Sequence, residues 1–139
     1  MFTPVSMRSA NSYRTVGLET SVTGANPHQL VSLLFDALQQ ALSAAKGAIL
    51  SGDIAAKGRS VSRAVRILEE GLKAGLDAER GGDLAANLRS VYDYCIIKTT
   101  EANLRNDATM IDEVIRLIHP VSDGWNQIRN EVGARTYQA

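Results

Sequence analysis

Apolar residues recur at helical spacing in four successive segments of this chain, and this recurrence is the strongest constraint on its fold. The segments run from about 26 to 50, 54 to 77, 83 to 105 and 106 to 133. Apolar positions at i, i+3, i+4 and i+7 are typical of an amphipathic helix, and no segment alternates with the period of a strand. Long helices joined by connections of only a few residues pack as antiparallel neighbours. The sequence therefore predicts an all-α fold, an antiparallel up-down four-helix bundle.

Helix start and stop signals separate these segments. Asn26 can cap the first helix, and Gln29 three residues later can complete a capping box. Gly52 is a typical C-terminal stop, and Asp53 can cap the second helix. We expect Asp83, which follows a Gly-Gly turn, to cap the third helix. The connections between helices are therefore short.

The first 25 residues differ from the rest because they lack a sustained helical or strand period. We expect a flexible, mobile N-terminal arm or cap at 1–25, followed by one helical-bundle domain at 26–139. A chain of 139 residues suits a single core. Its 15 basic and 15 acidic residues cancel, so the sequence favours no nucleic-acid partner. No apolar run has the length of a membrane span and no secretory signal is recognisable, so we expect a cytoplasmic protein without direct membrane insertion.

The sequence contains no recognisable catalytic or metal-binding pattern. His28 and His119 lie in different predicted helices, and neither belongs to a Glu-x-x-His pair of the kind that binds di-iron centres. Cys95, the single cysteine, falls on an apolar stripe where a buried, unreactive thiol is the usual outcome. We therefore expect no cofactor, no metal and no enzymatic activity.

Three predicted helices carry more apolar surface than one buried face requires. Apolar residues cover an arc of about 200° on the first helix, whereas a surface helix needs about 100°. The second helix has a flank of small residues beside its core stripe, and the third has a second stripe next to a core stripe that includes Leu84 and Cys95. Two interpretations stay open: tight packing against two neighbours, or a hydrophobic groove for a partner helix.

Two residues of the fourth predicted helix carry a structural expectation. Trp125, the only tryptophan, is expected to plug the core near one end of the bundle. Pro120 interrupts the periodic pattern and removes one backbone hydrogen bond, so we expect a kink there.

Five pieces of the chain form a specific pattern when they are taken in order. They are Tyr13 in the arm, NPHQLVSLLFDAL at 26–38, RGGDLAANLRSVYDY at 80–94, EANLRND at 101–107 and EVIRLIHPVSDGWNQI at 113–128. This pattern resembles the flagellin-specific export chaperones of the bacterial flagellar type III system, the FliS family. The resemblance spans nearly the whole chain, with departures such as Phe35 in place of a common tyrosine and Cys95 in place of a common methionine.

The resemblance implies a cytoplasmic chaperone for flagellin export. Such a protein binds the disordered C-terminal segment of flagellin, prevents its premature polymerisation and delivers it to the flagellar type III export apparatus. The resemblance also implies that the arm with Tyr13 caps part of the hydrophobic site in the free protein. The residues that we expect to contact the partner are Leu30, Leu34, Phe35, Ala64, Ile67, Gly71, Asn87, Tyr92, Ile96 and Asn103.

One alternative from another class is a self-associating structural helical bundle that has no client. The chaperone interpretation predicts a monomer or a weak dimer, whereas the alternative predicts a tight dimer. The sequence leaves open which flagellin is bound, and whether the export-gate protein and an anti-sigma regulator are further partners.

Overall fold

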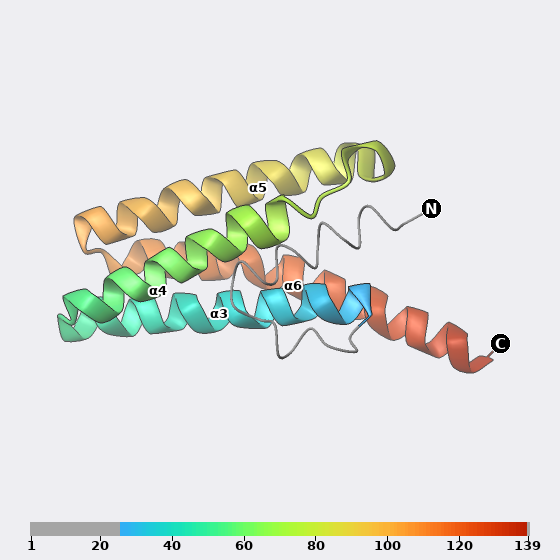
Figure 1. The fold of residues 1–139 in the computed structure, drawn as a ribbon, viewed down its shortest axis with the longest axis horizontal. Coiled ribbons are helices and arrows are strands. Elements are labelled where there is room, and N and C mark those ends of the chain that lie inside the picture. Colours follow the sequence, from blue (N-terminus) through green and yellow to red (C-terminus); the bar gives the residue numbers. More distant parts are fainter. Residues whose placement is uncertain (1–25, 139) are drawn as a thin grey trace.

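Four helical segments run alternately up and down in the computed structural model of this chain (Figure 1). The structure describes residues 26–138, with side chains as far as Ile128. The elements are α3 (Pro27–Ser51), α4 (Ile54–Arg66), the π-helix η1 (Ile67–Lys73), α5 (Ala78–Arg105) and α6 (Ala108–Gln138). The described residues contain no strand, so the predicted four-helix bundle is confirmed. The predicted arm at 1–25 lies outside the described residues.

Local capping sets the bounds of α3 and the start of α4, as predicted. The Asn26 side chain accepts a hydrogen bond from the Gln29 N–H at 2.8 Å, and the Gln29 side chain accepts one from the Asn26 N–H at 3.0 Å. Gly52 follows α3 with a φ of 74°, a left-handed conformation that glycine adopts without steric cost. Asp53 then accepts a hydrogen bond from the Ala56 N–H at 3.0 Å.

The second helical segment departs from the regular α-helix predicted for 54–77. The regular helix α4 ends at Arg66, and the chain continues to Lys73 as η1. A π-helix closes its hydrogen bonds five residues back, as the Ala74 N–H does to the Glu69 carbonyl at 3.2 Å. The wider turn changes which side chains face the core. No residue type marks a π-turn, so the periodic pattern alone does not predict it.

The third helix begins earlier than the predicted cap at Asp83. Asp77 caps its first turn, because the Asp77 side chain accepts hydrogen bonds from the N–H groups of Glu79 and Arg80 at 3.1 and 3.2 Å. Gly82 then breaks the helical path with φ 51° and ψ −127°. The break at Gly82 divides α5 into a short first piece and a long helix, so the predicted helix boundary near Asp83 is confirmed. Sequence reasoning found the glycine turn and missed the capped turn before it.

The fourth helix, α6, extends past its predicted end near 133 and reaches Gln138. It continues through Pro120 as one helical element, although proline has no N–H to donate to the preceding turn. Pro120 is exposed to solvent.

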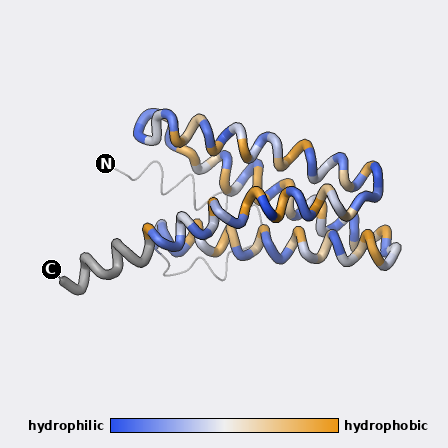
Figure 2. Tube along the Cα trace, turned by 180° about the vertical axis from the view of Figure 1, so that it is seen from behind, coloured by the Kyte–Doolittle hydropathy of each residue, from blue (hydrophilic) through white to orange (hydrophobic). Residues whose placement is uncertain are grey.

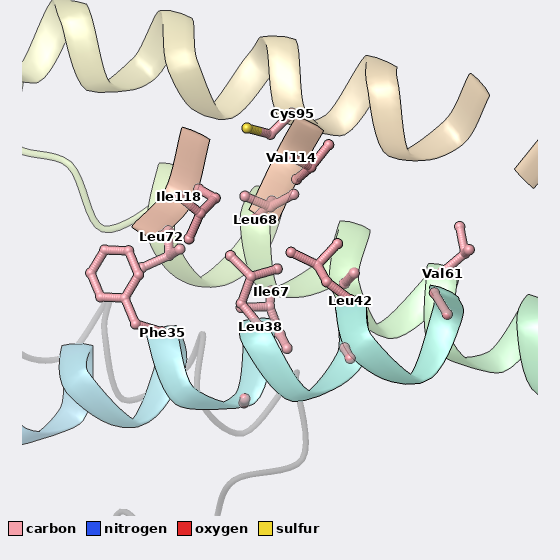
Figure 3. Close-up of a cluster of buried hydrophobic side chains, with 14 of the residues drawn as sticks. Phe35, Leu38, Leu42, Val61, Ile67, Leu68, Leu72, Cys95, Val114 and Ile118 are labelled. Atoms are coloured by element: carbon pink, nitrogen blue, oxygen red, sulfur yellow. The ribbon is translucent and has the colours of Figure 1, made fainter. Parts of the chain in front are cut away.

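The core lies between α3, the second helical segment, α5 and α6 (Figure 3). Its largest fully buried side chains are Leu34, Leu38, Leu42, Ile67, Leu68, Ile111, Ile118, Val114, Thr99 and Cys95. The helix α3 contacts α4, η1 and α6, which accounts for most of its wide apolar arc. Burial raises the pKa of the Cys95 thiol to about 11, so this thiol stays protonated and unreactive at neutral pH.

Apolar and polar residues are interspersed along every described helix, as expected for amphipathic helices (Figure 2). None of the helices in the described part of the chain is both long and apolar enough to cross a membrane. Most apolar residues instead face the interior of the bundle. The exposed large ones lie near its ends, apart from Tyr94 and Ile97 in the middle of α5.

Candidate functional site

An apolar groove of about 490 Å³ opens at one end of the bundle. There the first turns of α3 and the first half of α5 meet the end of η1 and the middle of α6 (Figure 1). None of its lining residues is charged, and they are Val31, Leu34, Phe35, Gly71, Leu72, Gly75, Leu76, Leu84, Leu88, Tyr92, Pro120, Val121, Gly124, Trp125 and Ile128. A concave apolar site of this size is typical of a binding pocket.

The floor of the groove is formed by close packing of α3 on η1. Leu34 and Phe35 are almost fully buried, and Phe35 lies with Leu72 at one edge of the core (Figure 3). A Cβ atom added at Gly71 would stand only 3.0 Å from Cδ2 of Leu34. Glycine at 71 therefore allows the two helices to approach, and this approach sets the depth of the groove.

The α5 wall combines a buried tyrosine with an exposed leucine. Tyr92 is almost fully buried, and burial raises the pKa of its hydroxyl above its ordinary value. Leu84, expected in the core, is instead 64 % exposed. That expectation was wrong because Leu84 follows the Gly82 kink, at the rim of the groove, where no described element covers it.

The α6 wall is held in place by contacts with the first turns of α3. Trp125 donates a hydrogen bond from Nε1 to the backbone carbonyl of His28 at 3.0 Å. Its ring also stacks on the imidazole of His28, with the ring centres 4.7 Å apart. Ser32 donates a longer hydrogen bond to Oδ1 of Asn126 at 3.4 Å. Trp125 is therefore half-buried. It packs against the core cluster near one end of the bundle, as the sequence suggested, and it also lines the groove.

Gly124, the neighbour of Trp125, leaves part of the groove open. A Cβ atom added there would meet no heavy atom within 4 Å. A side chain at this position would therefore extend into the groove rather than into a neighbouring helix.

Charged groups lie outside the groove and pair with one another. Lys73 contacts Asp93 at 2.6 Å and Glu69 at 3.4 Å, so it links η1 to α5. The hydrogen bond with Asp93 is the main reason that the Lys73 pKa is raised. Tyr94 donates a hydrogen bond to Glu113, which joins α5 to α6 and raises the Tyr94 pKa. No group of three acidic, histidine or cysteine side chains in the described residues could hold a metal ion.

The structure brings four of the expected partner-contact residues together in the groove. Leu34, Phe35, Gly71 and Tyr92 all line it. Leu30 is buried one turn before Leu34 and does not line the groove.

The other expected contact residues lie elsewhere. Ala64 and Ile67 are fully buried in the core, so neighbouring helices cover this part of the expected trough on the second helix. Gly71, expected in the same trough, lines the groove. Asn87 is exposed on α5 and Ile96 is half-buried against the core. Asn103 lies at the opposite end of the bundle, where its carbonyl accepts a hydrogen bond from Lys57 at 3.2 Å. Tyr13 lies outside the described residues.

Sequence reasoning placed no α6 residue at the site, although α6 supplies a third of the lining: Pro120, Val121, Gly124, Trp125 and Ile128. Each of these residues has an ordinary structural explanation when it is considered alone. The useful signal is a helical glycine next to the single tryptophan, because a large aromatic beside a missing side chain creates a hollow.

Comparison with known proteins shows the family of this chain. The family model described as "Flagellar protein FliS" matches residues 9–132. The chain belongs to the FliS family. It is 46 % identical to the flagellar secretion chaperone FliS of Salmonella typhimurium, over 84 % of this chain and 87 % of that protein. It is 40 % identical to FliSB of Pseudomonas aeruginosa, over 88 % of this chain and 96 % of that protein, and 35 % identical to FliS of Escherichia coli, over 86 % and 88 %.

The FliS match covers the whole groove, because all of the lining residues lie between 31 and 128. The names of the FliS relatives describe chaperones of flagellar secretion, so this is a chaperone family and not an enzyme family.

Proposed function

We propose that this protein is a cytoplasmic export chaperone that binds the C-terminal segment of flagellin in the apolar groove. Two findings support the proposal: its membership of a family of flagellar secretion chaperones, and an open groove whose lining carries no charge. By covering the segment, the protein would prevent premature polymerisation and hold its client ready for delivery to the flagellar type III export apparatus.

The groove has the chemistry that an amphipathic segment requires. Apolar side chains at i, i+3, i+4 and i+7 of a client helix can enter a groove of this kind. Tyr92 and Trp125 supply aromatic surface, which contributes strongly to binding in protein interfaces. The exposed Leu84 and Ile128 at the rim would gain the most from being covered. Coupled folding and binding of a disordered segment buries roughly 1,000–3,000 Å², so the contact would extend beyond the groove.

A titration with a peptide that copies the last 40 or so residues of the host's flagellin tests this function. We expect binding with a negative heat-capacity change in calorimetry and a gain of helix in circular dichroism, because apolar surface is buried and the segment becomes ordered. Absence of binding at high micromolar peptide would contradict the proposal. A tight dimer in sedimentation at micromolar protein, combined with absence of peptide binding, would favour the self-associating bundle instead.

We also propose that residues 1–25, including Tyr13, cover the groove until a client displaces them. This part of the proposal rests on the family resemblance and on the open groove. Deletion of residues 1–20 should then increase the fluorescence of a dye that binds exposed apolar surface. Unchanged dye binding would count against the cap and would leave the client site unaffected.

A further inference from the structure

The charged residues of α4 are all basic. Its 13 residues include Lys57, Arg59, Arg63 and Arg66 and no acidic residue. Every other described helix carries at least one aspartate or glutamate. This concentration stands out because the whole chain has no net charge.

Three of these basic residues point to the same side of α4. Arg59, Arg63 and Arg66 stand at i, i+4 and i+7, which is one face of a helix. Together with Ser62 they surround a hollow of about 170 Å³. We refer to Arg59, Ser62, Arg63 and Arg66 as the basic face of α4. Seven residues of helix span roughly 10 Å, so the basic face presents its guanidinium groups over a short, defined length.

Structural needs account for only part of this arrangement. Arg66 contacts Glu70 at 3.5 Å, but this pair is exposed, and exposed ion pairs contribute little to stability. The helix dipole favours cations near the C-terminus of a helix, where Arg63 and Arg66 lie. Arg59 stands in the first half of α4, where the dipole gives no such advantage. Lys57 has a separate role, since its Nζ donates to the Asn103 carbonyl and to Oδ1 of Asn106.

We propose that the basic face of α4 is a docking surface for a protein partner that presents carboxylates along one side of a helix, with one carboxylate in the hollow. Guanidinium groups bind carboxylates with paired hydrogen bonds, and Ser62 adds a hydroxyl donor at the same hollow. A partner helix with glutamates at i, i+4 and i+7 matches the spacing of the three arginines. Charge complementarity therefore selects an acidic helix as the occupant.

A protein partner fits this surface better than a nucleic acid does. Single-stranded nucleic-acid sites combine basic grooves that follow the backbone with aromatic side chains on which bases stack. The basic face of α4 is short and contains no aromatic residue. It also shares no residue with the apolar groove. The proposal is thus independent of the proposed function.

A fluorescent alanine-based peptide with glutamates at i, i+4 and i+7 is the direct probe, measured by anisotropy on the full chain at low ionic strength. We expect binding that weakens as sodium chloride is added. The double variant Arg59→Ser, Arg63→Ser should bind about tenfold more weakly, because two charge pairs are lost. The matched control is Arg89→Ser, Arg116→Ser, which removes the same charge from exposed positions of α5 and α6 and should change binding less than twofold.

Three outcomes would overturn the proposal. The first is equal loss of binding in both double variants, which would indicate a general charge effect. The second is unchanged binding in the α4 variant whose helical circular dichroism is intact. The third is tighter binding to a single-stranded oligonucleotide than to the peptide. Inorganic phosphate at moderate concentration should compete with the peptide for the hollow. Failure to compete would contradict the proposed binding of a carboxylate in the hollow.

The two proposals can fail separately. The α4 variant should bind the flagellin peptide as the wild-type protein does. Binding of the glutamate peptide without any binding of the flagellin peptide would refute the groove function alone, and the reverse result would refute the α4 surface alone.

Discussion

The two ends of the bundle contain similar numbers of exposed apolar side chains but differ in shape. At one end, short turns join α3 to α4 and α5 to α6, and both turns contain a left-handed residue, Gly52 or Asn106. Lys57 bridges these two turns by donating hydrogen bonds to the Asn103 carbonyl and to Asn106, each at 3.2 Å. Leu50 and Leu104 are exposed there, and neither lines a described pocket.

The other end is open because its elements are spaced differently. Among residues 26–138, which the structure describes, a single connection, between η1 and α5, crosses it. The kink at Gly82 and the absent side chain of Gly124 leave space between α5 and α6. Leu84 and Ile128 therefore border a groove, whereas Leu104 is exposed and lines neither described pocket. Isolated exposed leucines are common on proteins, and concavity distinguishes a binding site from them.

The largest expected effect on stability comes from a comparison of the core with the closed end, the end of the bundle at which Gly52 and Asn106 lie. Leu38→Ala should reduce the free energy of unfolding by about 2–5 kcal/mol, because Leu38 is fully buried and the variant leaves a cavity. Leu104→Ala should change it by less than about 0.5 kcal/mol. Chemical denaturation monitored by circular dichroism measures both. A large loss for the Leu104 variant would mean that the closed end is covered in solution.

The next effect concerns the open end. Gly124→Leu should weaken flagellin-peptide binding at least tenfold, because the new side chain occupies the groove, and each tenfold change is about 1.4 kcal/mol. Stability should not fall, since a Cβ at 124 meets no neighbour and leucine favours helix more than glycine does. Gly47→Leu is the matched control, because position 47 is an equally open helical glycine that lies outside the groove. Equal binding by both variants would place the client elsewhere.

A smaller effect concerns the contact between α6 and α3. Trp125→Phe removes the Nε1 hydrogen bond to the His28 carbonyl and should reduce stability by about 1 kcal/mol. It should also weaken peptide binding, since the α6 wall loses this contact and some aromatic area. Denaturant unfolding and calorimetry measure the two effects. A variant with full peptide affinity would show that the position of the wall does not depend on this contact.

The smallest effect comes from the middle of the bundle, between its two ends. The folded Cys95 thiol has its pKa raised to about 11 from 9.0, so an unfolded chain releases a proton that the folded chain retains. Stability should therefore fall as pH rises from 9 towards 11, with a contribution of about 1 kcal/mol at pH 10. Tyr92 acts in the same direction at higher pH, because burial raises its pKa also. Cys95→Ala should show a shallower decline between pH 8 and 10, and an identical decline would assign the effect to other groups.

The parts of the fold that depend on local chemistry could be predicted from the sequence. The capping box at Asn26 and the stop at Gly52 involve residues within one or two turns, so the pattern contains the needed information. The π-helix at Ile67–Lys73 could not be predicted, because its register depends on how η1 packs on α3 and α5.

The site could be predicted only where the apolar surplus was already visible along one helix. Phe35 belongs to the wide apolar arc of the first helix, and Tyr92 belongs to the second stripe of the third helix. Both line the groove. Trp125 and Gly124 gain their role only when α6 is placed against α3, and that placement is tertiary. Ala64 and Ile67 show the converse, since small and apolar residues that suggest a trough are covered by neighbouring helices.

The position of Trp125 has a practical consequence for spectroscopy. It is the only tryptophan in the chain, and it is half-buried in the groove wall beside His28. Indole emission shifts towards the blue when water is excluded from the ring, so the protein carries an intrinsic optical reporter at the site itself. Loading and release of a client that lacks tryptophan could then be followed in real time by stopped-flow fluorescence, without any attached label.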